Sequence, residues 1–283
     1  RNLLAEMPEG MGTVAIRTDK DANGSALIPN ATAEYVFAIE GMEVNQIVAL
    51  DYRRVTYPED HTGPRPYEGY VIINPVTGYP SVSASSEALG NTTPKHRLGL
   101  DLKVKWKDLT LTTLFEYRGN FYACASQLGG GLDFSGASAR SAYYNRDRFV
   151  FPNSVYEDPN NPGSYIENTN ITVSDGGTGF WTGGTYNRSV TANYVYRADY
   201  WKWREVALVY TLPRSVVNKI PGIAGGSIAL QGRNLFLWTA KANEYTDPDY
   251  SQTRSADDNE TGVSSLWQAP PTRTFGATVS LTF

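Results

Sequence analysis

The stretch RTFGATVSLTF, residues 273–283, decides the fold of this chain. Residues at every second position from Arg273 to Phe283 are mainly apolar, whereas those between them, from Thr274 to Thr282, are small and polar. A repeat of two residues is typical of a β-strand with one apolar face. Outer-membrane barrel strands turn an apolar face toward lipid, turn a polar face toward the lumen and place aromatic residues at the membrane edge. We therefore predict an all-β protein, in which 273–283 closes an antiparallel transmembrane β-barrel.

Two further alternating segments, 97–106 and 109–118, are joined by Lys107 and Asp108. The first segment has apolar residues on one face, while its other face is charged and carries Arg97, Asp101, Lys103 and Lys105. Each segment has about the ten residues that a tilted strand needs to cross a bilayer. Because charges are costly in a dry core, we expect the charged face to line a water-filled lumen.

The remaining predicted strands are less regular, and the connections alternate in length. These strands are placed near 31–40, 44–55, 199–210 and 227–238. The long connections are predicted outer loops, at 57–96, 119–198 and 239–272, and Gly129-Gly130-Gly131 is expected to be a flexible loop tip. The short connections, after Glu40, Trp106 and Tyr210, then all fall on the periplasmic side, as in transmembrane barrels.

The number of strands predicts an incomplete barrel. About seven strands result, whereas single-chain bacterial barrels have an even number and at least eight. The chain also opens on Arg1 without a signal sequence, which a barrel protein needs to cross the inner membrane. We therefore expect it to be the C-terminal part of a larger barrel.

Composition excludes several other classes. The net charge is −4 with no basic run, which argues against nucleic-acid binding. No apolar run approaches the roughly 20 residues of a membrane helix. Cys124 is the one cysteine, so no disulfide forms within the chain. His61 and His96 belong to no HExxH pattern, and no GxSxG motif is present, so an enzyme is not expected.

Several segments resemble one family. They are ADYWKWREVALVYTLP (198–213), GRNLFLWT (232–239), DPDYS (247–251) and PPTRTFGATVSLTF (270–283), with FAIEGMEVNQIVALDY (37–52) and residues 91–120 upstream. In this order and spacing they resemble the C-terminal end of SusC/RagA-type TonB-dependent transporters of Bacteroidota. The chain departs from the commonest family pattern at 91–94, where a second proline often stands.

The resemblance implies the last third of a plugged barrel of about 22 strands. A signal sequence, a plug domain and the N-terminal part of the barrel then lie upstream. The implied function is TonB-dependent import of a large nutrient, an oligosaccharide or oligopeptide (glycan or peptide), across the outer membrane. A SusD-like surface lipoprotein closes over the outer loops. The alternative is a passive porin or adhesin-like barrel without energy coupling. Substrate identity and oligomeric state do not follow from the sequence.

Aromatic and basic residues gather in the predicted loop 119–198. The candidate substrate-binding residues are Tyr143, Tyr144, Arg146, Phe180, Trp181 and Tyr186. Their aromatic faces can stack on sugars or peptide groups, and packing within the loop or contact with the lipoprotein is the alternative. In 200–204, aromatic and basic residues alternate, which indicates a membrane-edge aromatic belt with its basic residues turned to the lumen or to lipid phosphates.

Acidic residues provide candidates for a cation site. Asp19, Asp21 and Asn23 match the first half of a calcium loop, but Asn30 replaces the glutamate of the twelfth position, and an ordinary turn is the alternative. Asp247 and Asp249, and the acidic run 257–260, are further candidates in an outer loop, with a solvated loop as the alternative. No other cofactor is expected.

The C-terminal aromatics have a predicted assembly role. Phe275 and Phe283 resemble the signal that the barrel-assembly machinery reads in outer-membrane proteins. Anchoring at the membrane edge, in contact with lipid or lipopolysaccharide, is compatible with the same role.

Overall fold

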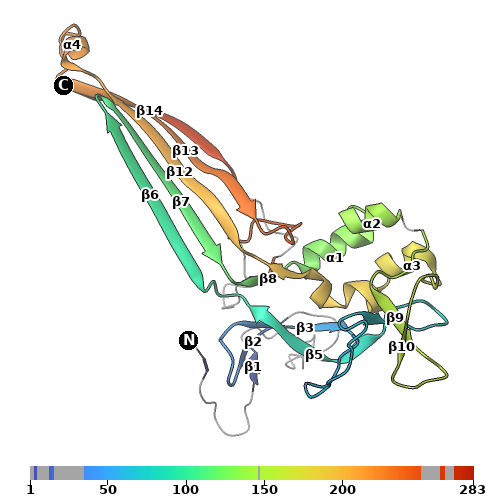
Figure 1. Ribbon diagram of the computed structural model, residues 1–283. Coiled ribbons are helices and arrows are strands. Elements are labelled where there is room, and N and C mark those ends of the chain that lie inside the picture. Colours follow the sequence, from blue (N-terminus) through green and yellow to red (C-terminus); the bar gives the residue numbers. More distant parts are fainter. Residues whose placement is uncertain (1–2, 5–12, 16–34, 146, 250–261, 265–270) are drawn as a thin grey trace, which may run out of the picture. The chain divides into compact units, whose positions relative to one another are not determined.

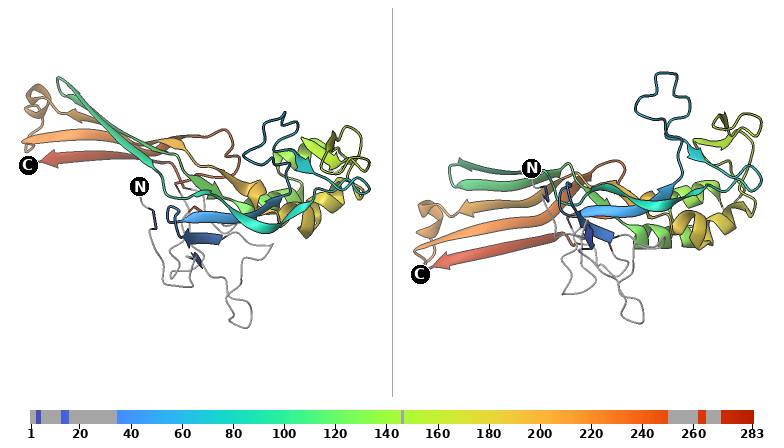
Figure 2. Two further views of the ribbon diagram at one scale, coloured as in Figure 1. Left: turned by 60° about the horizontal axis from the view of Figure 1, so that its bottom comes forward. Right: turned by 90° about the horizontal axis from the view of Figure 1, so that it is seen from below.

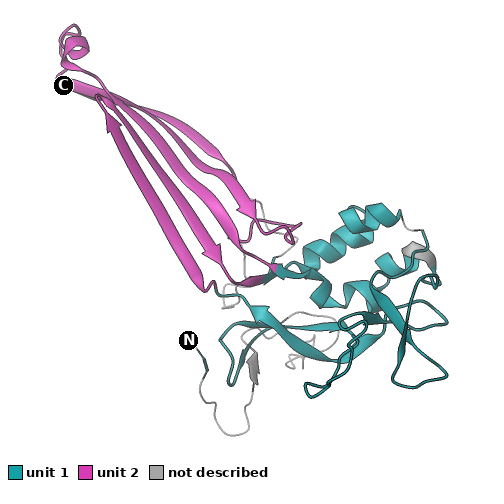
Figure 3. Cartoon of the chain, in the orientation of Figure 1, with its two compact units in different colours: residues 1–93, 123–196, 251–267 teal, residues 94–122, 197–250, 268–283 magenta. Residues whose placement is uncertain are grey.

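The computed structural model describes residues 3–4, 13–15, 35–145, 147–249, 262–264 and 271–283. The chain divides into two compact units (Figure 3). Unit 1 comprises 1–93, 123–196 and 251–267, and unit 2 comprises 94–122, 197–250 and 268–283. Each unit is described by itself.

Unit 2 is built on one antiparallel sheet of five strands in the order β14-β13-β12-β7-β6 (Figure 1). Its strands are β6 (His96–Trp106), β7 (Leu109–Gly119), β12 (Tyr200–Thr211), β13 (Gly225–Thr239) and β14 (Thr274–Thr282). The strands β6, β7 and β14 have the two-residue alternation described above, and β12 and β13 lie at the less regular segments 199–210 and 227–238.

The strand connections at one end of this sheet are compact. Lys107, with φ of 52°, makes the tight turn between β6 and β7. The short helix α4 (Arg214–Val217) lies between β12 and β13, near the C-terminus at the same end of the sheet (Figure 2).

Unit 1 contains smaller sheets and most of the helices. One sheet has the order β1-β2-β3-β5, another β10-β9-β4, and β8 pairs with β11. The strands are β1 (Thr13–Ala15), β2 (Tyr35–Ile39), β3 (Gln46–Tyr52), β4 (Val71–Ile72), β5 (Val82–Asn91), β8 (Tyr122–Cys124), β9 (Ser154–Glu157), β10 (Tyr165–Glu167) and β11 (Val195–Arg197). The helices are α1 (Ser126–Ser135), α2 (Ala139–Tyr144), α3 (Gly176–Thr182), the π-helix η1 (Gly184–Arg188) and the 3-10 helix η2 (Thr191–Tyr194). No described helix is long and apolar enough to cross a membrane.

The predicted strands near 31–40 and 44–55 do not join the five-stranded sheet. Their described parts are β2 and β3, and β3 pairs with β5 on its other side. The strand β5 lies inside 57–96, which was expected to be an outer loop. Its sequence VSASSEALGN has no apolar alternation, so only the pairing with β3 reveals it.

The predicted loop 119–198 is also more structured than expected. Gly129, Gly130 and Gly131 lie inside α1 rather than at a flexible loop tip, so that prediction is wrong. Glycine disfavours a helix by about 1 kcal/mol per residue relative to alanine. Packing supplies the compensation, because Gly129 and Gly130 are buried and the Tyr194 ring lies beside Gly130. The protein is thus mostly β, with a helical part that local propensity does not indicate.

Candidate functional site

One face of the five-stranded sheet is apolar across all five strands. Residues directly opposite each other in antiparallel strands share a face. The register aligns Leu100, Phe115, Trp203 and Phe236 in one row and Val104, Leu111, Leu208, Leu230 and Ala277 in another. Many of these side chains are exposed, including Leu100, Val104, Leu230 and Phe236. A continuous exposed apolar surface marks a site of contact with lipid or with another protein.

Aromatic side chains occupy both ends of this apolar face. At the end where β7 and β13 finish, Trp203 stacks between Phe115 at 5.3 Å and Phe236 at 5.7 Å between ring centroids. The neighbouring row holds Tyr117, Trp201 and Trp238. We call these six residues the upper aromatic band. At the opposite end, Trp106, Tyr210 and Phe283 are exposed.

The other face of the sheet is polar. Lys103 and Lys105 on β6 lie opposite Thr112 and Thr110 of β7. On β14 the alternate residues are the threonines and Ser280, and Arg233 of β13 pairs with Glu205 of β12 at 3.1 Å. The charged face predicted for 97–106 is therefore continued by polar residues on the other strands, with Leu114 and Val209 among the apolar exceptions.

A β-bulge interrupts this pattern in β12. Trp203 lies opposite Phe115 and Glu205 lies opposite Leu114, so Arg204 is an extra residue. The bulge lets the Arg204 side chain reach Glu116 and Asp249, close to Lys202. In 200–204 the two tryptophans thus lie on the apolar face, while Lys202 and Arg204 turn to the polar face.

Lys202 and Arg204 belong to a network of ion pairs with the segment that follows β13. Lys202 Nζ lies 2.6 Å from Asp247 Oδ2 and 3.2 Å from Asp249 Oδ2, and the Lys202 side chain is 4% exposed. Asp249 also accepts hydrogen bonds from Arg204 and from the Tyr200 hydroxyl at 2.8 Å. Arg118 completes the network, at 2.6 Å from Glu116 and 3.4 Å from Asp249. We call this set the ion-pair latch, because it fastens 247–249 to β7 and β12.

The ion-pair latch sets the partners of Asp247 and Asp249 and lowers the pKa of Asp249. Burial alone would raise the pKa of Asp249, but hydrogen bonds from Arg204 and Tyr200 and the charge of Lys202 outweigh it and hold this pKa well below its usual value. Both carboxylates therefore face protein cations. Their partners are side chains of this chain, whereas the sequence suggested either a bound cation or a loop open to solvent. The acidic run 257–260 lies outside the described residues.

A second buried carboxylate organises the helices of unit 1. Asp133 of α1 is fully buried and accepts hydrogen bonds from Ser138 at 2.6 Å, Asn187 at 2.9 Å and the Tyr194 hydroxyl at 2.8 Å. It also pairs with Arg140 of α2. Burial would raise the pKa of Asp133, but Arg140 above all lowers it below its usual value. This hub joins α1, α2, η1 and η2.

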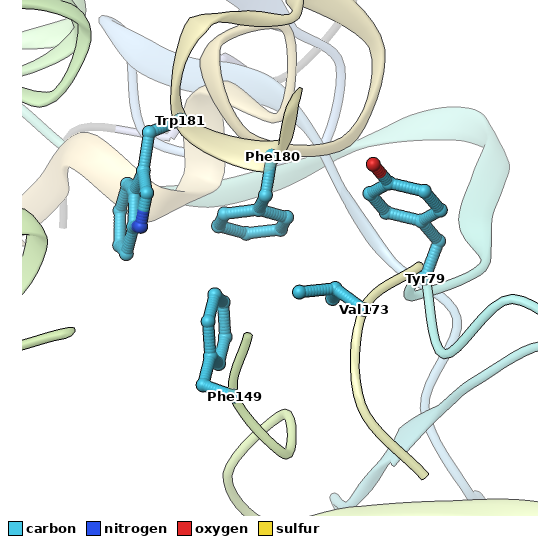
Figure 4. Close-up of a cluster of buried hydrophobic side chains, with 5 residues drawn as sticks. All are labelled: Tyr79, Phe149, Val173, Phe180 and Trp181. Atoms are coloured by element: carbon cyan, nitrogen blue, oxygen red, sulfur yellow. The ribbon is translucent and has the colours of Figure 1, made fainter. Parts of the chain in front are cut away.

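Aromatic residues form the core beside this hub. The buried cluster consists of Tyr79, Phe149, Val173, Phe180 and Trp181 (Figure 4). Phe180 and Trp181 are each 3% exposed, and Tyr144 packs against the cluster. The ring planes of Phe180 and Trp181 are perpendicular, at 4.9 Å between centroids. Their burial fits the packing interpretation of these two residues.

The other candidate substrate-binding residues are distributed differently. Tyr143 is 83% exposed. Tyr186 is partly exposed and stacks on Tyr79 at 4.2 Å. Burial and a hydrogen bond to Asp175 raise the pKa of Tyr79 to about 12, which keeps its hydroxyl protonated. Arg146 lies outside the described residues. Substrate contact through Tyr143 and Tyr186 stays a prediction.

The predicted calcium loop cannot be placed, because Asp19, Asp21 and Asn23 lie outside the described residues. Within the described ranges, no group of three or more His, Cys, Asp or Glu side chains is arranged to hold a metal ion. Cys124 is buried. Phe275 and Phe283, the candidate assembly signal, are both exposed on the apolar side of β14.

Comparison with solved structures finds chains of a peptide importer. The RagAB peptide importer in its closed-closed state matches with a TM-score of 0.54 at 14% identity. The open-open state matches at 0.52 and 15%, and a further RagAB peptide transporter structure at 0.53 and 15%. Each match covers 99% of this chain and 25–26% of the other, so the chain spans about a quarter of the length of the chains it matches. At this identity the likeness shows a shared fold.

Two other comparisons gave no match. No family model matches the chain. No curated protein matches it either.

Sequence reasoning named Asp247, Asp249 and the basic residues of 200–204 but missed their pairing, and it missed the Asp133 hub. Asp247 and Lys202 are 45 residues apart, and Asp133 and Tyr194 are 61 apart. The one local signal was the break in alternation at Arg204, which reads as a bulge once the neighbouring strands are known.

Proposed function

We propose that the five-stranded sheet is part of the barrel wall of an outer-membrane transporter, with its apolar face toward lipid and its polar face toward a water-filled lumen. The observation that carries this proposal is the separation of the two faces. Large apolar side chains such as Leu100, Val104 and Leu230 are exposed on one face, while charged side chains occupy the other. A sheet packed in a water-soluble core would bury its apolar face instead.

The spacing of the aromatic residues supports the same arrangement. Tyr117 of β7 lies in the upper aromatic band. Leu109 of β7 aligns with Trp106 and Tyr210 at the opposite end of the face, and it is 8 residues away from Tyr117 along the strand. At about 3.4 Å per residue this is about 27 Å along the strand. A tilt of about 40° reduces it to roughly 21 Å across the membrane, close to the apolar band of about 25 Å between aromatic girdles.

The edges of the sheet indicate that further strands complete the wall. In the described part of the chain, β6 and β14 each pair on one side only. Open edges are too costly in lipid, where backbone groups have no water to bond. We propose that the remaining strands belong to a SusC/RagA-type TonB-dependent receptor with a plug domain, of which 1–283 is the C-terminal part.

The transported substrate in this proposal is a large nutrient, and a peptide is favoured over an oligosaccharide. The preference rests on the likeness to RagAB peptide importer chains. A SusD-like surface lipoprotein would close the outer side, TonB would supply energy through the plug, and the barrel-assembly machinery would insert the chain. The protein then belongs to the Gram-negative outer membrane and catalyses no covalent reaction.

Labelling of substituted cysteines tests the proposed wall. In the full-length protein in outer membranes, Lys103→Cys should react with a membrane-impermeant maleimide from the lumen. The adjacent Leu102→Cys should stay protected by lipid, because it lies on the opposite face of β6. Equal labelling of both would contradict a lipid-facing and a lumen-facing side.

Uptake measurements test energy coupling and substrate class separately. Cells carrying the full-length transporter should accumulate labelled oligopeptides, and loss of TonB should abolish the accumulation. Uptake that is indifferent to TonB would instead support the passive porin. Uptake of oligosaccharides but not of oligopeptides would support the proposed transport and contradict the preference for a peptide substrate.

A further inference from the structure

Arg273 is a cation on the apolar side of the five-stranded sheet. It precedes β14, whose Phe275, Ala277 and Val279 lie opposite Gly232, Leu230 and Ile228 on the apolar face. Since side chains alternate along a strand, Arg273 lies on the same side as Phe275. Its guanidinium lies over the ring of Phe236, 5.5 Å from the ring centroid. Arg273 therefore borders the upper aromatic band.

The partners of Arg273 differ from those of three cations that lie on the polar face. Lys202, Arg204 and Arg233 are each paired with carboxylates. For Arg273, no carboxylate of the described residues lies within ion-pair distance, and its side chain is exposed. Stacking on Phe236 covers one surface of the guanidinium plane but leaves its N–H donors, which lie in the plane, available.

The position of Arg273 along the strand places it at a membrane boundary. Ten residues separate Arg273 from Phe283, which is about 34 Å of extended chain. A tilt of about 40° projects this onto roughly 26 Å, the height of the apolar band of a barrel. Arg273 and Phe283 thus mark the two edges of that band, with apolar side chains between them. An arginine at the edge of the band has lipid phosphates within reach.

We propose that Arg273, with the upper aromatic band, binds the phosphate of a lipid headgroup in the outer leaflet. This inference rests on the proposed membrane-spanning wall. A guanidinium presents donors in a planar fork that matches two phosphate oxygens. Phe236, Trp203 and Trp238 provide the apolar surface on which the acyl region of the same lipid packs. The stacking on Phe236 holds the guanidinium in place, which reduces the entropy lost on binding.

The test measures binding of lipid A by the full-length protein in detergent. The probes are lipid A with its phosphates and the same lipid after enzymatic dephosphorylation. We expect the wild type to bind the phosphorylated form more tightly. Arg273→Gln should weaken that binding by about tenfold or more, the effect of losing a charge-assisted hydrogen bond. Binding of the dephosphorylated lipid should be the same in both proteins.

Arg233→Gln is the matched control, because Arg233 is exposed on the polar face of the neighbouring strand and pairs with Glu205. It should leave lipid A binding unchanged. An unchanged affinity in Arg273→Gln, an equal loss in Arg233→Gln, or equal binding of both lipid forms by the wild type would overturn the proposal.

A second measurement separates this proposal from the proposed wall. Brominated lipids should quench Trp201, Trp203 and Trp238 equally in wild type and in Arg273→Gln, because these side chains lie on the apolar face in both. If the lipid quenches these tryptophans but the protein binds both forms of lipid A equally, the Arg273 site is rejected and the proposed barrel wall is supported. Absence of quenching rejects the wall itself.

Discussion

The five-stranded sheet of unit 2 and the helical part of unit 1 distribute large apolar residues in opposite ways. In the sheet, Leu230 and Trp238 are exposed. In unit 1, Phe180 and Trp181 are buried. Unit 1 follows the ordinary rule of a protein in water, whereas the exposed apolar face of the sheet needs lipid or another protein to cover it. The sheet therefore lacks a cover that the helical part of unit 1 supplies for itself.

The largest expected effect is in the buried aromatic cluster of unit 1. Phe180→Ala should destabilise unit 1 by about 3–5 kcal/mol, because it removes apolar contacts and leaves a cavity. Hydrogen–deuterium exchange of the full-length protein should show faster exchange of amides in α3 and its neighbours. Tyr143→Ala is the control, since Tyr143 is 83% exposed, and it should change exchange little. Equal effects of the two variants would contradict a water-type core.

The next effect is in the ion-pair latch. Lys202→Met should cost about 3 kcal/mol, because it leaves Asp247 buried without its cation. The expected cost is at the lower end of the range because Asp249 keeps Arg204 and Tyr200. Faster exchange of amides in 243–249 would report the loss.

Lys105→Met serves as the control for Lys202→Met. Lys105 is exposed on the polar face of β6, so its removal should have almost no effect. If both variants behave alike, the latch does not hold the segment.

A smaller effect is expected on the apolar face. Leu230→Lys places a charge inside the apolar band, one row from that of Trp106 and Tyr210, and should destabilise the proposed barrel by about 2 kcal/mol in lipid. Its neighbour Ala229 lies on the polar face, so Ala229→Lys should cost close to zero. Unfolding of the full-length protein in vesicles measures both. A larger cost for Ala229→Lys would reverse the assignment of the two faces.

The smallest expected effect is the loss of stability at low pH that Asp249 causes. The pKa of Asp249 is held below that of the unfolded chain, so its contribution to stability is fully present above about pH 4. That contribution should be lost as the pH falls from about 4 toward the lower pKa of the folded state. The thermal midpoint of the full-length protein in detergent, followed from pH 6 to pH 3, should fall more in wild type than in Asp249→Asn. Parallel curves would contradict a role for the Asp249 carboxylate.

Local alternation was sufficient to predict β6, β7 and β14 of unit 2. The strands β6, β7 and β14 coincide closely with the predicted segments 97–106, 109–118 and 273–283. Each strand has one apolar and one polar face, and the alternation of its own residues shows this. The aromatic residues at the edges of the apolar face were likewise visible in 200–204. The aromatic chemistry of Phe180 and Trp181 is visible in the sequence, but exposed rings and buried rings look alike there.

Elements without alternation were not predictable in this way. The strand β5 exists through its pairing with β3, and α1 forms although it contains consecutive glycines. In both, contacts between distant segments outweigh local preference. The pairing of the described parts of 31–40 and 44–55 with each other and with β5 likewise depends on contacts that a strand's own residues do not specify.

The sequence by itself determined that the chain has long two-faced strands, which face of each strand is apolar, and where aromatic residues mark its ends. These properties are local, because side chains alternate along an extended backbone. Only the tertiary structure decided that Lys202 and Arg204 meet Asp247 and Asp249, that Asp133 joins the helices, and that Arg273 lies on the apolar side over Phe236. Such contacts depend on strand order, register and a bulge, which bring together residues that the sequence keeps far apart.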